Sequence, residues 1–136
     1  MNKDNKTVVV TGGAGYVGSP LVSVLLNNNF NVIVVDKLVS GGESLLRVWH
    51  NPNFFFYKLD ITQPDKLEKV FKKHKVYAVI HLAAIVGDPA CAKNPELAKQ
   101  VNYMASKNLL NLALVNNVER FIFTSTCSNY GKMADP

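Results

Sequence analysis

The sequence has little cysteine. Its two cysteines, Cys91 and Cys127, lie neither in a Cys-x-x-Cys pair nor in the spacing of a metal site. Cysteine-based metal sites bring several ligands together at short, regular spacings. We therefore expect two reduced, partly buried thiols, no structural disulfide and no metal centre.

Long hydrophobic runs are also absent. No apolar stretch approaches the about 18 residues that a membrane-spanning helix needs. The residues before the first apolar run, 1–6, are polar, which leaves no room for a signal peptide. We therefore expect a cytoplasmic protein that does not contact a membrane.

Acidic residues are scarcer than basic ones: 10 Asp and Glu stand against 15 Lys and Arg, giving a net charge of +5. Much of the excess lies in the segment 65–75, where lysines flank an apolar stripe of Leu67, Val70 and Phe71. No arginine interleaves with these lysines, as it does in many nucleic-acid sites. We interpret the segment as a solvated helix face and expect no nucleic-acid partner.

With 48% apolar and 18% charged residues, the 136-residue chain is expected to form one globular domain, 1–136. Apolar runs predict strands at 7–11, 31–36, 54–59, 77–83 and 120–125. Most do not alternate with polar residues, as is typical of parallel strands covered by helices on both faces. The run at 54–59 is expected at or near an edge.

Helical patterns occupy the segments between these runs, at 16–28, 43–50, 64–74 and 94–115. Thr62 and Asn94 are the expected caps of the last two. This alternation predicts an α/β fold, a Rossmann-like doubly wound parallel sheet of about five strands in the order 3-2-1-4-5.

A glycine-rich turn links the first expected strand to the first helix. Residues 11–18 are Thr-Gly-Gly-Ala-Gly-Tyr-Val-Gly, an arrangement that binds a dinucleotide pyrophosphate. Asp36 closes the second apolar run, 18 residues after Gly18, where a carboxylate can accept both hydroxyls of an adenosine ribose. It would repel a 2′-phosphate, so NAD is favoured over NADP, although Lys37 weakens this preference slightly. The alternative is a turn that only packs a helix.

Further candidates follow the other strands, where ligands bind in such sheets. Asp60 can accept from an adenine amino group with Ile61 against the ring, or it can be a simple turn or capping residue. His81 is expected to be a hydrogen-bonded core residue rather than a catalytic one. The small residues after it would let a cofactor pass close to the backbone; this segment is Leu82, Ala83 and Ala84. The hydroxyls of Thr124, Ser125 and Thr126 end the last strand.

Together and in this order, these motifs resemble the amino-terminal part of extended short-chain dehydrogenases/reductases of the NAD-dependent nucleotide-sugar epimerase/dehydratase family. The resemblance covers nearly the whole chain and implies hydride transfer between NAD and a carbon of a nucleotide sugar. The family's pyrophosphate turn corresponds to Gly12, Gly15, Tyr16, Val17 and Gly18. The resemblance also places Asn102 near the cofactor and Thr124 and Ser125 beside the nicotinamide. It assigns Thr126 the catalytic hydrogen bond to the reacting oxygen.

The chain departs from the family pattern in two ways. Cys127 and Ser128 replace the Asp-Glu pair of the dehydratases, and neither can act as a carboxylate acid or base. An epimerase or related oxidoreductase is therefore expected rather than a dehydratase. The family's Tyr-x-x-x-Lys helix follows the last strand and has no counterpart in these residues, because Tyr103 and Lys107 have the spacing but precede that strand. The family's carboxy-terminal substrate domain has no counterpart in them either.

We accordingly expect the 136-residue chain to bind NAD and to be inactive alone. The alternative is a non-catalytic NAD(H)-binding module. The helix at 95–116 is apolar around much of its circumference, which indicates more than one packing partner. In the family this helix contributes to a dimer, so a homodimer or self-association through 95–116 is expected.

Overall fold

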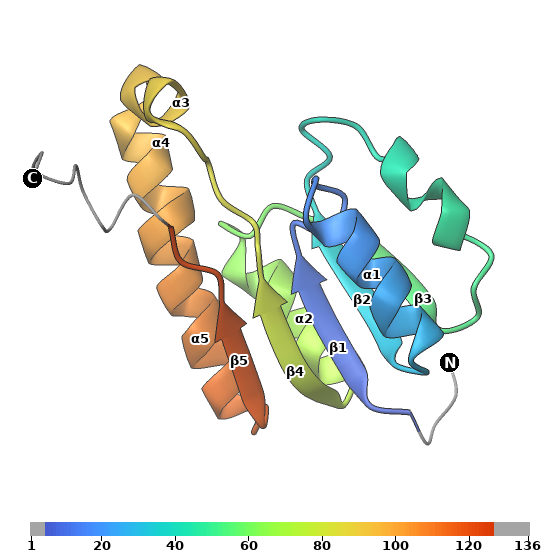
Figure 1. The fold of residues 1–136 in the computed structure, drawn as a ribbon. Coiled ribbons are helices and arrows are strands. Elements are labelled where there is room, and N and C mark those ends of the chain that lie inside the picture. Colours follow the sequence, from blue (N-terminus) through green and yellow to red (C-terminus); the bar gives the residue numbers. More distant parts are fainter. Residues whose placement is uncertain (1–4, 127–136) are drawn as a thin grey trace, which may run out of the picture.

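The computed structural model describes residues 5–126. Its five strands form one parallel sheet in the order β3-β2-β1-β4-β5, which confirms the predicted topology (Figure 1). The strands are β1 (Thr7–Thr11), β2 (Asn31–Asp36), β3 (Phe54–Lys58), β4 (Val76–His81) and β5 (Arg120–Phe123). β1 and β2 have the predicted bounds, and β4 begins one residue earlier than predicted. β3, β4 and β5 end one or two residues early, where the residue pairing between strands stops after one last backbone hydrogen bond.

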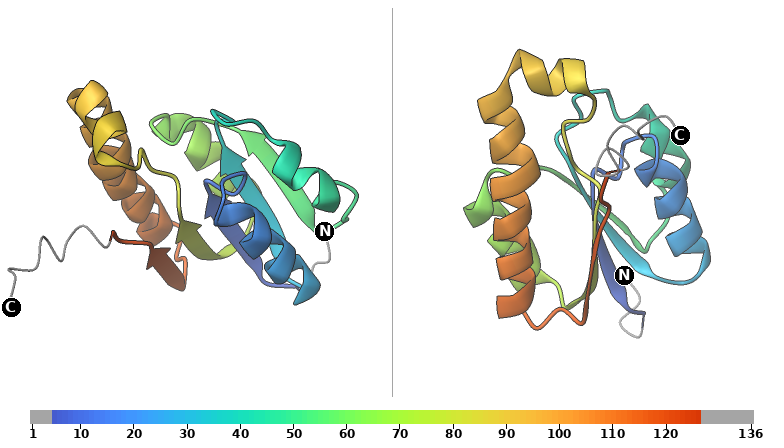
Figure 2. Two further views of the ribbon diagram at one scale, coloured as in Figure 1. Left: turned by 45° about the horizontal axis from the view of Figure 1, so that its top comes forward. Right: turned by 60° about the vertical axis from the view of Figure 1, so that its left-hand side comes forward.

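Helices cover both faces of the sheet, as the lack of alternation predicted. They are α1 (Gly18–Asn27), the 3₁₀ helix η1 (Glu43–Val48), α2 (Pro64–Lys73), α3 (Asp88–Lys93), α4 (Pro95–Lys99), the π-helical segment η2 (Gln100–Ala105) and α5 (Ser106–Val115). The views in Figures 1 and 2 show α1 and η1 on one face, with α2 and α5 on the other.

Two apolar layers result, because successive side chains of a strand point to opposite faces. Val9, Ile33 and Val79 pack toward α2 and α5, and each is 0% exposed. Val10 and Val34 pack toward α1 and η1. The central strands β1 and β2 are therefore fixed from both sides, and their carboxyl ends form a rigid base for the loops that follow.

The expected caps had different outcomes. Asn94 caps α4 as predicted, with its Oδ1 accepting from the backbone N–H of Leu97 at 3.0 Å. Thr62 was wrong as a cap for α2, because the residue before that helix is Gln63 and the Thr62 hydroxyl donates to Asp60 Oδ1 at 2.8 Å instead.

The predicted single helix 94–115 is a composite of α4, η2 and α5. Within it, Ser106 Oγ donates to the carbonyl of Asn102 at 2.9 Å, beside the π-helical turn. Helix α3 was not predicted. Hydrophobic periodicity reveals neither feature, and neither follows from the side-chain hydrogen bonds between Asn102 and Ile85, which a single sequence does not show.

The buried helix face gives a first stability prediction. Leu109 of α5 is 0% exposed against the sheet, whereas its neighbour Leu110 is 40% exposed. We expect Leu109→Ala to lower the free energy of unfolding by about 2–5 kcal/mol, because it leaves a cavity. Leu110→Ala is the matched control, with an expected loss below about 1 kcal/mol. Urea unfolding followed by circular dichroism measures both, and similar losses would contradict this packing.

Candidate functional site

The predicted site residues gather where β1, β2 and β4 end. Because the strands are parallel, their carboxyl ends share one edge of the sheet. Figure 1 shows the glycine turn leading from the tip of β1 into α1, beside the ends of the neighbouring strands. The turn, the end of β2 and the segment after His81 therefore lie together, as expected for a ligand site in a doubly wound sheet.

The glycines of the turn are required by close backbone packing. Gly12 has φ +71°, and a Cβ there would lie 2.8 Å from Ala83 N and 2.9 Å from Ala83 Cα. A Cβ on Gly18 would lie 2.6 Å from Gly13 Cα. Gly15 is exposed, and a Cβ there would meet only the Gly12 carbonyl oxygen, at 3.2 Å. Gly12 and Gly18 thus shape the turn, and Gly15 keeps its outer backbone accessible.

The amino terminus of α1 is suited to an anion. Among the described residues, no side chain caps this helix, and its first turn carries no acid. Ser19 N already donates to Gly15 O at 3.0 Å and Pro20 has no N–H, so the backbone before Ser19 and the positive end of the helix dipole are what favour a phosphate. Tyr16 and Val17 of the turn are exposed, with 97% and 59% of their surfaces accessible. The turn thus presents donors that a pyrophosphate can use.

Asp36 connects the turn to the end of β2. Its Oδ2 accepts from the backbone N–H of Ala14 at 3.0 Å, and its Oδ1 accepts from that of Leu38 at 2.7 Å. Each carboxylate oxygen can accept more than one hydrogen bond, so both keep capacity for ribose hydroxyls. Asp36 therefore fixes the turn and remains able to bind a ligand.

Asp60 forms a tight turn with Thr62 and an ion pair with Lys37. Its Oδ1 accepts from Thr62 N at 3.0 Å, and its Oδ2 lies 2.7 Å from Lys37 Nζ. Burial raises the pKa of Asp60, but hydrogen bonds from Lys37 and Thr62 and the Lys37 charge outweigh burial and lower it. Asp60 is thus a turn residue, and its contact with adenine stays a prediction. Ile61 is 6% exposed and packs in the α2-side core, so its adenine contact also stays a prediction.

His81 is a hydrogen-bonded core residue, as predicted. The Ser106 hydroxyl donates to the Asn102 carbonyl and therefore accepts from His81 Nε2, at 2.8 Å. Nδ1 then accepts from Thr11 Oγ1 at 2.6 Å, and Thr11 in turn accepts from Ala83 N at 3.3 Å. Burial lowers the pKa of His81 to about 4, so the ring is neutral near pH 7. The hydrogen bonds of Thr11 and Ser106 to His81 were not predicted, because the partner of a single hydroxyl carries no sequence signal.

The segment after β4 is attached to both neighbouring elements. The Asn102 side chain donates to Ile85 O and accepts from Ile85 N, each at 2.8 Å. Leu82 N donates to Thr11 O at 3.1 Å, while Ala84 is exposed. The segment is therefore ordered, as a wall of a binding site should be.

Three hydroxyl residues follow β5, and the structure gives a side-chain contact for the first of them, Thr124. Thr124 Oγ1 donates to His81 O at 2.8 Å, which attaches the end of β5 to β4. Ser125 and Thr126 follow in the chain, and their proposed contacts with nicotinamide and substrate stay predictions. The positions of Cys127 and Ser128 lie outside the described residues.

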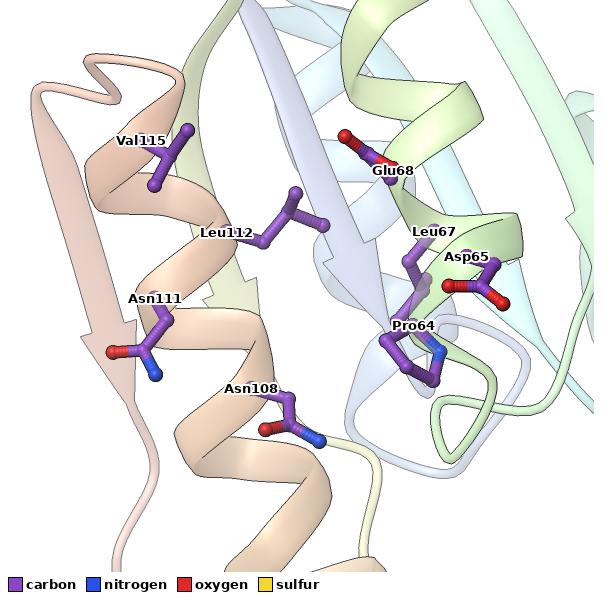
Figure 3. A pocket seen from close by; sticks show the side chains of 8 residues that line it. All are labelled: Pro64, Asp65, Leu67, Glu68, Asn108, Asn111, Leu112 and Val115. Atoms are coloured by element: carbon purple, nitrogen blue, oxygen red, sulfur yellow. The ribbon is translucent and has the colours of Figure 1, made fainter.

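A separate groove of about 310 Å³ lies between α2 and α5 (Figure 3). It is lined by Pro64, Asp65, Leu67, Glu68, Asn108, Asn111, Leu112 and Val115. None of the predicted cofactor-binding residues lines it. Within residues 5–126, no three metal-ligating side chains gather, and none of the helices there is long and apolar enough to cross a membrane.

Comparison with known proteins matches residues 8–136 to the model of the NAD dependent epimerase/dehydratase family. UDP-glucose 4-epimerase of Drosophila melanogaster is 39% identical over 93% of the chain, which spans 39% of that protein. The Thermotoga maritima UDP-glucose 4-epimerase, solved with UDP-glucose, has a TM-score of 0.86 and 36% identity, with 96% of this chain and 41% of that one covered. The Thermus thermophilus UDP-glucose 4-epimerase complex with NAD has a TM-score of 0.79 and 31% identity, and the match covers 88% of this chain and 37% of that one.

Proposed function

Because the chain belongs to the NAD-dependent epimerase/dehydratase family, we propose that it is the cofactor-binding portion of a nucleotide-sugar epimerase or related oxidoreductase. The chain spans about two fifths of the Drosophila melanogaster and Thermotoga maritima relatives. The observation that carries the proposal is the Asp36 carboxylate, which hydrogen-bonds the glycine turn and ends β2 next to an uncapped helix. The carboxylate fixes the turn and also keeps acceptor capacity for ribose hydroxyls, which supports a cofactor site at this edge.

NAD, when bound, supplies a hydride acceptor and donor, and the residues of this chain bind and orient it. The turn from Gly12 to Gly18 and the first turn of α1 would hold the pyrophosphate. Asp36 would accept from the adenosine ribose, and Asp60 would lie at the adenine end. The backbone of 82–84 would flank the cofactor beyond β4.

The substrate side of the proposal concerns the end of β5. Thr126 would donate a hydrogen bond to the reacting oxygen of the sugar, with Thr124, Ser125 and Asn102 beside the nicotinamide. A nucleotide sugar is the proposed substrate, since the Thermotoga maritima relative is solved with UDP-glucose. Because Tyr103 and Lys107, which have the Tyr-x-x-x-Lys spacing, precede β5 instead of following it, we expect the 136-residue chain to be inactive by itself.

Self-association through the helical segment 95–116 belongs to the same proposal. Leu110, Leu114 and Val115 of α5 are 40%, 65% and 81% exposed, although a leucine or valine gains free energy on burial. Covering this surface with a second copy would remove it from water. A monomeric mass at high concentration by light scattering would contradict this part of the proposal.

The proposed cofactor site is tested by calorimetric titration of the 136-residue chain with NAD. We expect Asp36→Ala to weaken NAD binding at least about tenfold, because the ribose loses a charged acceptor and the turn loses its hydrogen bond. Asp65→Ala, at the exposed start of α2, is the matched control and should leave affinity unchanged. Absence of NAD binding by the parent chain, or equal binding by the Asp36 variant, would overturn the proposal.

A further inference from the structure

The ion pair between Lys37 and Asp60 lies next to the proposed ribose site. Lys37 directly follows Asp36, and its Nζ lies 2.7 Å from Asp60 Oδ2. The two segments are fixed side by side, because Leu59 N donates to Asp36 O at 3.1 Å at the end of the β2–β3 ladder. A cation and an anion of known position therefore adjoin the carboxylate that would bind the cofactor.

Within this pair, Asp60 determines where the ammonium group lies. The side chain of Asp60 is 21% exposed, whereas that of Lys37 is 61% exposed. Asp60 Oδ1 also accepts from Thr62 N and Thr62 Oγ1, at 3.0 and 2.8 Å, which fixes the carboxylate independently of the lysine. Its lowered pKa keeps it ionised at neutral pH. Lysine has a long flexible stem, so it would take another position if this carboxylate were removed.

A cation beside the ribose acid is the group that a ribose 2′-phosphate would use, because charge-assisted hydrogen bonds to phosphate are strong. We propose that Asp60 is a specificity-determining residue, which retains the Lys37 ammonium in an ion pair and thereby preserves the preference for NAD over NADP. The inference rests on the proposed NAD site. It differs from a direct contact of Asp60 with adenine, which both dinucleotides would share.

The test is the ratio of the NADP to the NAD dissociation constant for the 136-residue chain. Any adenine contact of Asp60 affects both dinucleotides equally and cancels in this ratio. D60N removes the charge but keeps an amide oxygen for the hydrogen bonds from Thr62. We expect the ratio to fall about tenfold in D60N, because Lys37 is released toward the 2′-phosphate.

K37M and the double variant D60N/K37M complete a double-mutant cycle. If Lys37 acts only when released, K37M alone should change the ratio less than about twofold, and D60N should have little effect in the K37M background. E68Q is a control that breaks the Glu68–Lys72 ion pair of α2 with the same change of charge. Its ratio should equal that of the parent.

Two results would overturn the inference while leaving the cofactor site intact. An unchanged ratio in D60N, with the fold verified by circular dichroism, would show that Asp60 does not control specificity. If D60N changed the NADP-to-NAD ratio equally in the parent and in K37M, the loss of one negative charge would explain the change without any movement of Lys37. If the parent chain binds no NAD at all, the proposed function fails and this inference fails with it.

Discussion

Gly18→Ala is expected to abolish measurable NAD binding and to lower the free energy of unfolding by about 2–3 kcal/mol. The added Cβ would lie 2.6 Å from Gly13 Cα and 2.9 Å from Gly13 C. Both are backbone atoms of the same turn, so the methyl group cannot be accommodated by a side-chain rotation. The helix would have to move away from the turn, and the donors at its amino terminus would move with it.

Gly42→Ala is the matched control for this substitution. Its φ of −135° suits any residue, and the nearest atoms to an added Cβ are the Leu38 side-chain carbons, at 3.2 and 3.3 Å. We expect a stability change within about 1 kcal/mol and unchanged NAD affinity. Thermal unfolding and calorimetry measure both variants. A Gly18 variant as stable as the Gly42 variant would show that the helix start is not packed as described.

The second large effect is a loss of stability in mild acid that His81 controls. Burial lowers the pKa of His81 from 6.5 to about 4 in the folded chain. The unfolded chain therefore takes up a proton at a higher pH than the folded chain does. The contribution of neutral His81 is fully present above about pH 6.5 and is lost as the pH falls toward 4, amounting to about 3 kcal/mol.

The hydrogen-bond chain gives the structural reason for this expectation. A proton on Nδ1 would be directed at Thr11 Oγ1, which already accepts from Ala83 N, and the Thr11 hydroxyl would lose its acceptor. Phe121 and Phe123 lie beside the ring and offer no charge to compensate, with ring centroids 6.4 and 5.8 Å away. Protonation would therefore leave an unpaired charge in the core.

Urea unfolding at pH 7 and pH 4.5 tests this dependence. The His81→Gln variant should be less stable at pH 7 but should lose much less stability on acidification. His74 is the useful comparison, because burial and the nearby Lys73 charge also lower its pKa, in a more exposed position. His74→Gln should retain most of the parent's dependence. If His81→Gln lost as much unfolding free energy between pH 7 and pH 4.5 as the parent, groups other than His81 would be responsible for the acid sensitivity.

Much of this fold could be predicted from sequence because its signals are local. The apolar runs at 7–11 and 31–36 give β1 and β2 with their observed bounds, and the alternation of strands and helices with a glycine turn after the first strand indicates the dinucleotide-binding strand order. The glycine turn and Asp36 were found for the same reason, since a motif of fixed spacing describes them.

The parts that were not predicted depend on side-chain hydrogen bonds and ion pairs, some within one turn of the chain and some between distant segments. The π-helical turn lies beside the hydrogen bond from Ser106 Oγ to the Asn102 carbonyl. The Thr62 hydroxyl donates to the Asp60 carboxylate and does not cap α2. Whether Lys37 faces a ligand or Asp60 is decided by the pairing of β2 with β3. Side-chain partners of this kind have no periodicity that a single sequence could show.

The π-helical segment η2 has a consequence for which changes in chain length the protein can accommodate. A π turn contains one residue more than the α turn it replaces, so a one-residue deletion within 100–105 could restore a regular helix. The wider π turn takes up its extra residue locally, so α4 and α5 would keep the faces that they now turn toward the protein. Asn102 lies within the turn and would be displaced, so the segment after β4 would lose the hydrogen bonds to Ile85 N and O. Such a deletion should therefore disturb the loop after β4 while leaving the packing of the two flanking helices intact.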